Sequence, residues 1–183
     1  MPLDSATNDF IESNLQYYRE VTLATREFES QVESMLREVW GDYRRELAAV
    51  GLAGKKPERN LKQYDPDLFV NLFAQDKRGV EISISLNFAD ESPRFSAWSG
   101  VFVKDAELRQ TVNASIRKGT PVAFEIDIRA KETYIIARSD SEECSSLRKM
   151  LFESFRQLFK CLWKSPDFCA AYPPPPPRPA IHT

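Results

Sequence analysis

The N-terminal segment of this chain contains no residue that stops a helix, because neither proline nor glycine occurs between Leu3 and Trp40. Within it, apolar or near-apolar residues recur at alternating steps of three and four, the spacing of one helix face with a heptad-like repeat. These positions are Tyr18, Val21, Thr25, Phe28, Val32, Met35 and Val39. We therefore predict a long amphipathic helix within residues 1–50.

The length of this helix raises the question of what its apolar face covers. Roughly thirty helical residues span about 45 Å, which is more than a domain of this size usually covers. Either the helix breaks, with Gly41 as one candidate position, or part of it packs on something else, of which a second copy is the simplest. A plain amphipathic helix that lies across its own sheet is the other interpretation.

Strand patterns begin after a loop that we place at residues 51–64. Apolar and polar residues alternate strictly from Val80 to Phe88, which is typical of a strand with one buried face. Residues 95–103 continue as a second clear strand. Residues 68–74 are ambiguous, because they follow a helix-start signal and yet alternate as a strand does; we favour the strand.

The remaining elements complete an α+β core at residues 65–164. We expect a helix at 105–118, strands at 121–128 and 133–138, a capping box at 139–142 and then a strongly apolar helix ending near Trp163. The order α-β-β-β-α-β-β-α with hairpin connections predicts an antiparallel sheet of four to five strands, packed against the long N-terminal helix and the apolar C-terminal helix.

This order of elements, over roughly residues 65–165, is similar to that of small dimeric chaperone-like domains such as those of type III secretion. The resemblance lies in the element order, and a fold analogy of this kind says little about function.

Catalytic groups are scarce in this sequence. The only histidine is His182, beyond a run of prolines, so the predicted core has no Ser-His-Asp or Cys-His pair. The glycines never occur in a phosphate-binding pattern. We therefore favour a protein without catalysis or a cofactor.

One alternative is a metal-dependent or degenerate PD-(D/E)xK-like protein that processes nucleic acid. Glu125 and Asp127 are alternate residues of a predicted strand, about 7 Å apart on one face, and Glu81 could lie on a neighbouring strand. Carboxylates so placed can hold Mg²⁺. However, residues 95–103, where that fold carries its acidic and lysine residues, have neither.

Large aromatic side chains are the first candidates for a binding surface. They are Trp40, Tyr43, Trp98, Phe102 and Trp163. Those that a monomer cannot bury would form an interaction patch, since aromatic residues are enriched at the centres of interfaces.

Basic residues are the second candidates. Arg109, Arg117 and Lys118 lie on the middle helix. Lys55, Lys56, Arg59 and Lys62 cluster in the loop at residues 51–64. They could contact nucleic acid or an acidic protein surface. The formal net charge of −2 does not favour nucleic acid.

The C-terminal residues 165–183 read as a flexible, proline-rich tail. Pro173 to Arg178 also fits the P-x-x-P-x-R pattern that binds SH3-type domains. The three cysteines lack a pairing pattern and no apolar run could span a membrane, so we expect a cytoplasmic protein. Together these features predict a non-catalytic protein-protein interaction module, working as a homodimer in an inhibitor, adaptor, chaperone or immunity-type role.

Overall fold

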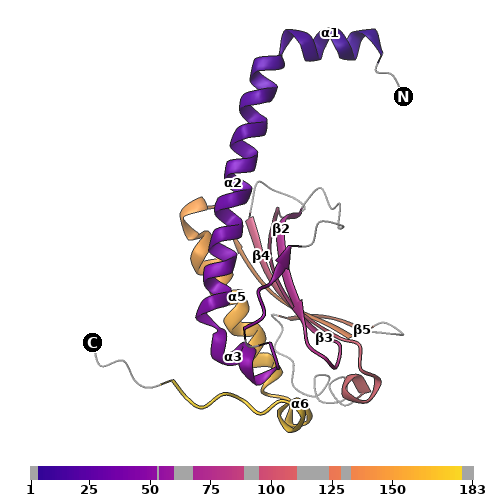
Figure 1. Ribbon diagram of the computed structural model, residues 1–183, viewed down its shortest axis with the longest axis vertical. Coiled ribbons are helices and arrows are strands. Elements are labelled where there is room, and N and C mark those ends of the chain that lie inside the picture. Colours follow the sequence, from indigo (N-terminus) through magenta and orange to yellow (C-terminus); the bar gives the residue numbers. More distant parts are fainter. Residues whose placement is uncertain are drawn as a thin grey trace, which may run out of the picture.

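The computed structural model describes residues 4–52, 54–59, 68–88, 95–110, 124–128 and 133–178. The helices are α1 (Ser5–Ser13), α2 (Leu15–Asp42), α3 (Arg44–Ala49), α5 (Leu147–Leu162) and α6 (Pro166–Ala171), with a 3-10 turn at Cys144–Ser146. The strands are β1 (Glu58–Arg59), β2 (Leu68–Gln75), β3 (Val80–Phe88), β4 (Phe95–Val103), β5 (Phe124–Ile128) and β6 (Thr133–Ser141). Figure 1 shows these elements in sequence colours.

The strands form one antiparallel sheet in the order β1-β2-β3-β4-β6-β5. The predicted α+β class and element order are confirmed, and residues 68–74 lie in a strand. The sheet has six strands rather than four to five, because the two-residue β1 pairs with β2 at its edge.

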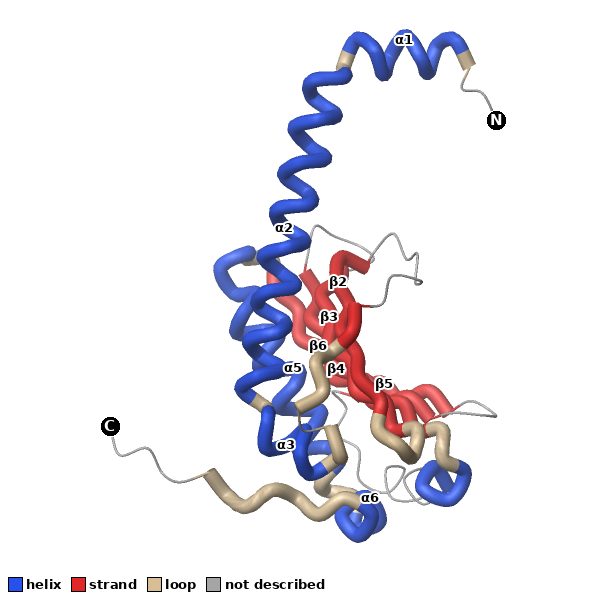
Figure 2. Tube along the Cα trace, viewed as in Figure 1, coloured by secondary structure: helices blue, strands red, loops and turns tan. Residues whose placement is uncertain are grey.

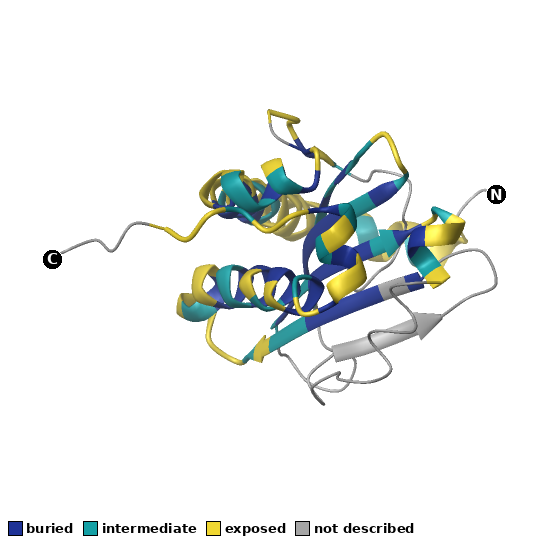
Figure 3. Ribbon diagram, turned by 90° about the horizontal axis from the view of Figure 1, so that it is seen from below, coloured by how far each residue is buried: buried dark blue, intermediate teal, exposed yellow. Residues whose placement is uncertain are grey.

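Two helices cover one face of this sheet (Figures 1 and 2). Helix α2 packs on β2, while α5 packs on β4 and β6. The register places Ile82, Ile84 and Leu86 of β3 beside Val101, Ser99 and Ala97 of β4, and all six are buried. The strict alternation in β3 thus supplies the apolar face on which the helices pack. Figure 3 shows this buried layer between helices and sheet.

Aromatic rings join α2 and α3 to α5. Trp40 stacks on Phe155 with ring centroids 5.7 Å apart. Tyr43, the cap residue between α2 and α3, packs against Phe155 and Phe159 at 4.9 and 5.7 Å. Complete burial of a side chain as large as Phe155 contributes about 1.5–3 kcal/mol to folding.

The long N-terminal helix has two breaks. One follows Gly41, since α2 ends at Asp42 and α3 begins at Arg44. The other, which the sequence analysis did not anticipate, is at Asn14, whose side-chain amide donates to the carbonyl of Phe10 over 2.8 Å. The same carbonyl also accepts from the backbone N–H of Asn14 at 3.2 Å, so the side chain is a second donor to it at the end of α1, and α2 leaves in a different direction (Figure 1).

The predicted capping box at residues 139–142 is wrong in its structural role. Residues 139–141 belong to β6 and pair with β4, and α5 begins only at Leu147. The Asp140 side chain accepts hydrogen bonds from Ser96 and Arg138 at 2.6 and 2.8 Å, so it stabilises the sheet instead of capping a helix.

Candidate functional site

The most exposed part of the described structure is an N-terminal arm, which we define as residues 5–27 of α1 and α2. It projects beyond the sheet and the other helices (Figure 1). No residue of α1 is buried, and the first buried residue of α2 is Val32. The large exposed apolar side chains of the described residues all lie in this arm: Phe10, Leu15, Tyr17, Tyr18, Val21 and Leu23.

The apolar face of the arm continues the face of α2 that packs on the domain. Val32 and Leu36 are fully buried, Phe28 is half-buried against the core, and Val21 one heptad earlier is 44% exposed. The helix therefore carries its docking face several turns past the edge of the domain. Most helical stability in proteins comes from packing of an amphipathic face, so this exposed stretch of α2 lacks the support that its docked half receives.

Charges are absent from both flanks of this face. In a heptad with Tyr18 and Thr25 at position a and Val21 at d, the flanking e and g positions carry no charge. The flanking residues are Tyr17, Thr22 and Ala24, and the charged residues Arg19, Glu20, Arg26 and Glu27 lie further round at b and c. Two arginines balance two glutamates there, so a second identical helix would meet no like charge at the contact.

Aromatic rings widen the apolar surface where α1 meets α2. Phe10 packs edge-on against Tyr18 with centroids 6.0 Å apart, and Tyr17 lies 6.2 Å from Tyr18. All three side chains are exposed. Such rings are the side chains that most often anchor protein interfaces.

Two of the predicted binding residues lie in the core instead. Trp40 and Tyr43 are buried, because α5 supplies the aromatic partners described above. The Tyr43 hydroxyl donates to the carbonyl of Phe152 over 3.3 Å, and burial raises the pKa of this phenol above its usual value. Neither side chain is available for a partner while α5 stays docked.

The structure does not gather the other predicted aromatics into one patch. Trp163 stacks on Phe159 at 5.2 Å beside the C-terminal segment, on the helical side. Trp98 and Phe102 alternate with the helix-facing residues of β4, and so lie on the opposite sheet face. There the Arg138 guanidinium sits 5.4 Å from the centre of the Trp98 indole.

The alternative carboxylate site is not assembled by the sheet. Glu81 is on β3 and Glu125 and Asp127 are on β5, with β4 and β6 between them. Three strand spacings separate Glu81 from the other two by about 14 Å. Glu81 instead lies 3.9 Å from the Lys104 amine.

The structure describes only part of the predicted basic surface. Arg109 lies on a helical turn at residues 106–110 and is half-buried, while Arg117 and Lys118 lie outside the described residues.

Residues 166–178 do not form the free tail that the composition predicts. Helix α6 follows α5, and the Tyr172 hydroxyl donates to Asp76 over 2.7 Å. Arg178 bonds to the Asp42 carbonyl and the Glu46 carboxylate, each at 3.0 Å, and its guanidinium lies 5.5 Å from the Tyr43 ring centre. The motif arginine thus already has an acidic and an aromatic partner within its own chain.

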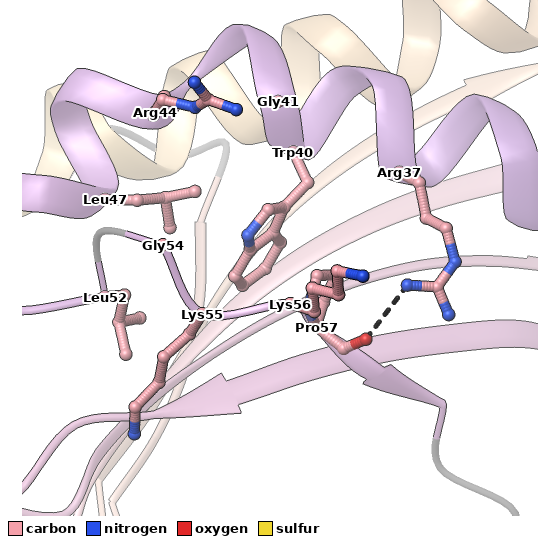
Figure 4. A pocket seen from close by; sticks show the side chains of 10 residues that line it. All are labelled: Arg37, Trp40, Gly41, Arg44, Leu47, Leu52, Gly54, Lys55, Lys56 and Pro57. Atoms are coloured by element: carbon pink, nitrogen blue, oxygen red, sulfur yellow. Dashed lines mark hydrogen bonds between the residues drawn. The ribbon is translucent and has the colours of Figure 1, made fainter.

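A pocket of about 660 Å³ lies between α2, α3 and the segment from Leu52 to Pro57. Figure 4 shows Trp40 pointing from α2 toward that segment, and Arg37 reaching the carbonyl of Pro57. Sequence reasoning noticed the lysines of this loop but could not place them beside arginines of α2 and α3.

No group of three or more His, Cys, Asp and Glu side chains among the described residues is placed to hold a metal ion. No helix of that part of the chain is long and apolar enough to cross a membrane. Comparisons with known protein families and with curated proteins found no match to this chain.

Proposed function

We propose that this protein is a non-catalytic protein-protein interaction module that acts as a homodimer, with the N-terminal arm as the pairing element. The observation that carries the proposal is the apolar face of the arm, exposed at Tyr18 and Val21 and continuous with the docked face of α2. An interface with another helix is the usual way to cover such a face.

A second copy of the chain suits this face for two reasons. The e and g positions are uncharged, so an identical helix brings no like-charge repulsion to the contact. Exposed apolar residues on both sides of the break at Asn14, which we call the elbow, include Phe10 and Leu15. They enlarge the surface that pairing would remove from water.

The paired arms would hold two folded bodies at a defined separation. Such a scaffold suits an inhibitor, adaptor, chaperone or immunity-type protein, each of which needs binding surfaces instead of a reactive centre. A cytoplasmic location fits the three cysteines, Cys144, Cys161 and Cys169, which are all free thiols.

Sedimentation velocity of two matched variants tests the proposal. Val21→Glu places a charge in the apolar face, whereas Leu23→Glu places the same charge on the opposite side of the helix, at a residue 54% exposed. We expect the wild type and Leu23→Glu to sediment as dimers at tens of micromolar, and Val21→Glu as a monomer. A monomeric wild type, or an equal effect of both substitutions, would contradict the proposal.

A further inference from the structure

The C-terminal segment 173–178 carries a motif that the proposed function does not use. It contains five consecutive prolines and then Arg178, in the spacing P-x-x-P-x-R. None of these residues lies in a helix or strand, and four of the five prolines are exposed. Because proline fixes φ at about −65°, such a run favours the polyproline II helix, which has three residues per turn. Pro173 and Pro176 share one edge of such a helix.

The arginine of this motif is held against α3 and the end of α2. A single nitrogen of Arg178, Nη2, donates to the Asp42 carbonyl and to the Glu46 carboxylate, each at 3.0 Å. The guanidinium also lies 5.5 Å from the Tyr43 ring centre. The Arg178 side chain nevertheless remains half exposed. An ion pair with so much solvent around it contributes little, so the arginine can leave α3 at small cost.

Helix α3 also holds the backbone of segment 173–178. The Arg45 side chain donates to the carbonyls of Pro176 and Pro177, and both prolines stay exposed. The segment is thus anchored near its charged end, with apolar surface facing water. Figure 1 shows it beside α3, at the end of the molecule away from the N-terminal arm.

We propose that residues 173–178 are a ligand for an SH3-type domain, and that α3 masks this ligand by holding Arg178. SH3-type domains bind polyproline II segments in a groove lined by aromatic residues, and the extended helix is already formed before binding. The arginine of the motif adds a charged hydrogen bond to a carboxylate of the domain. Glu46 supplies such a carboxylate within the chain, so the two partners compete for one guanidinium.

The mask tunes the affinity instead of abolishing it. The apparent affinity falls with the fraction of molecules in which the ligand is free. A half-exposed ion pair such as that of Arg178 with Glu46 changes this fraction by no more than about five-fold. The proposal does not rest on pairing of the N-terminal arm, so a monomeric protein would leave it intact.

Calorimetric titration of the full-length protein with a panel of SH3 domains that select P-x-x-P-x-R peptides tests the proposal. We expect Glu46→Gln to bind up to about five-fold more tightly than the wild type, because the competing carboxylate is neutralised. Adding Arg178→Ala to Glu46→Gln should weaken binding about ten-fold or more, the loss of a charged hydrogen bond. The matched control is Glu38→Gln, which removes an α2 carboxylate paired with Arg148 and should leave the affinity unchanged.

Any of three results would overturn the proposal. The first is that no domain of the panel binds Glu46→Gln at millimolar concentration. The second is equal affinity of the wild type and Glu46→Gln, which would mean that α3 does not mask the segment. The third is binding that survives Arg178→Ala, or tighter binding to a WW domain than to any SH3 domain, which would assign the prolines to a domain that does not read the arginine.

Discussion

A buried pair of serines links the sheet to α5 and allows a sharp test of the fold. Ser99 of β4 and Ser154 of α5 are both fully buried, and their hydroxyl oxygens lie 2.9 Å apart. Ser154 also lies 3.1 Å from the Leu151 carbonyl, to which it donates its only hydroxyl proton. Ser99 must therefore be the donor to Ser154, and the two removals are not equivalent.

The asymmetry sets the expected magnitudes. Ser154→Ala leaves the Ser99 hydroxyl buried without an acceptor, which costs about 1–3 kcal/mol of the free energy of unfolding. Ser99→Ala leaves Ser154 bonded to Leu151, so it should cost only about 0.5–1 kcal/mol. The double variant replaces both polar groups with methyl groups in an apolar layer, and should be more stable than Ser154→Ala alone.

Urea unfolding at one fixed protein concentration, followed by circular dichroism, measures these three variants against the wild type. The predicted sign of the coupling is positive, with the double variant recovering about 1–2 kcal/mol relative to the additive expectation. If the double variant instead loses the sum of the two single-variant losses, within about 0.5 kcal/mol, the assigned donor and the contact between α5 and β4 are refuted.

Three further outcomes are expected. Burial raises the pKa of Tyr43 and Tyr172 above the unfolded value near 10. The two phenols therefore contribute fully to stability below about pH 10, and this contribution falls as the pH rises further. Urea titrations across that range should show a steeper alkaline loss of stability for the wild type than for Tyr172→Phe. Cys144 is exposed, whereas burial raises the pKa of the Cys161 thiol, so iodoacetamide should alkylate Cys144 first. Peptide mass spectrometry measures both rates, and equal rates would contradict the packing of α5. Arg178→Ala should lower the free energy of unfolding, measured by urea titration, by at most about 1 kcal/mol, because the Arg178 side chain in its ion pair with Glu46 is half exposed. A loss of several kcal/mol would mean that the C-terminal segment supports the core.

The strands and the fold class could be predicted because their signal is local. The alternation from Val80 to Phe88 marks the residues that face the helices without reference to any other segment, and Ile82, Ile84 and Leu86 are buried there as predicted. The opposite face is not open to solvent as the pattern predicts, because Ser83 and Ser85 are buried as well. The elbow at Asn14 had no such signal, because asparagine occurs both inside and at the ends of helices. In the structure, the break is seen in the non-helical backbone of Asn14 and in its side-chain bond to the Phe10 carbonyl.

The candidate surfaces were harder to predict, because exposure depends on contacts between distant segments. Trp40 and Tyr43 are large aromatic residues near a helix end, where a side chain can belong to an interface or to the core. Both lie in the core because they pack against Phe155 of α5. Arg178 fits the motif that binds SH3-type domains, yet it forms an ion pair with Glu46, which lies far from it in the sequence. The heptad spacing at Tyr18 and Val21 was visible, but only the structure shows that the domain ends before it reaches them.

Hydrogen exchange of the backbone amides of residues 15–27 at two protein concentrations tests pairing of the arm most directly. Without a partner, these residues have no packing on their apolar face and can open from the N-terminal end of α2, so they exchange faster than paired residues would. We predict slow exchange at tens of micromolar that becomes fast on dilution, with the amides of α5 unchanged. Equally fast exchange at both concentrations would contradict the proposal that a second copy of the chain covers this face.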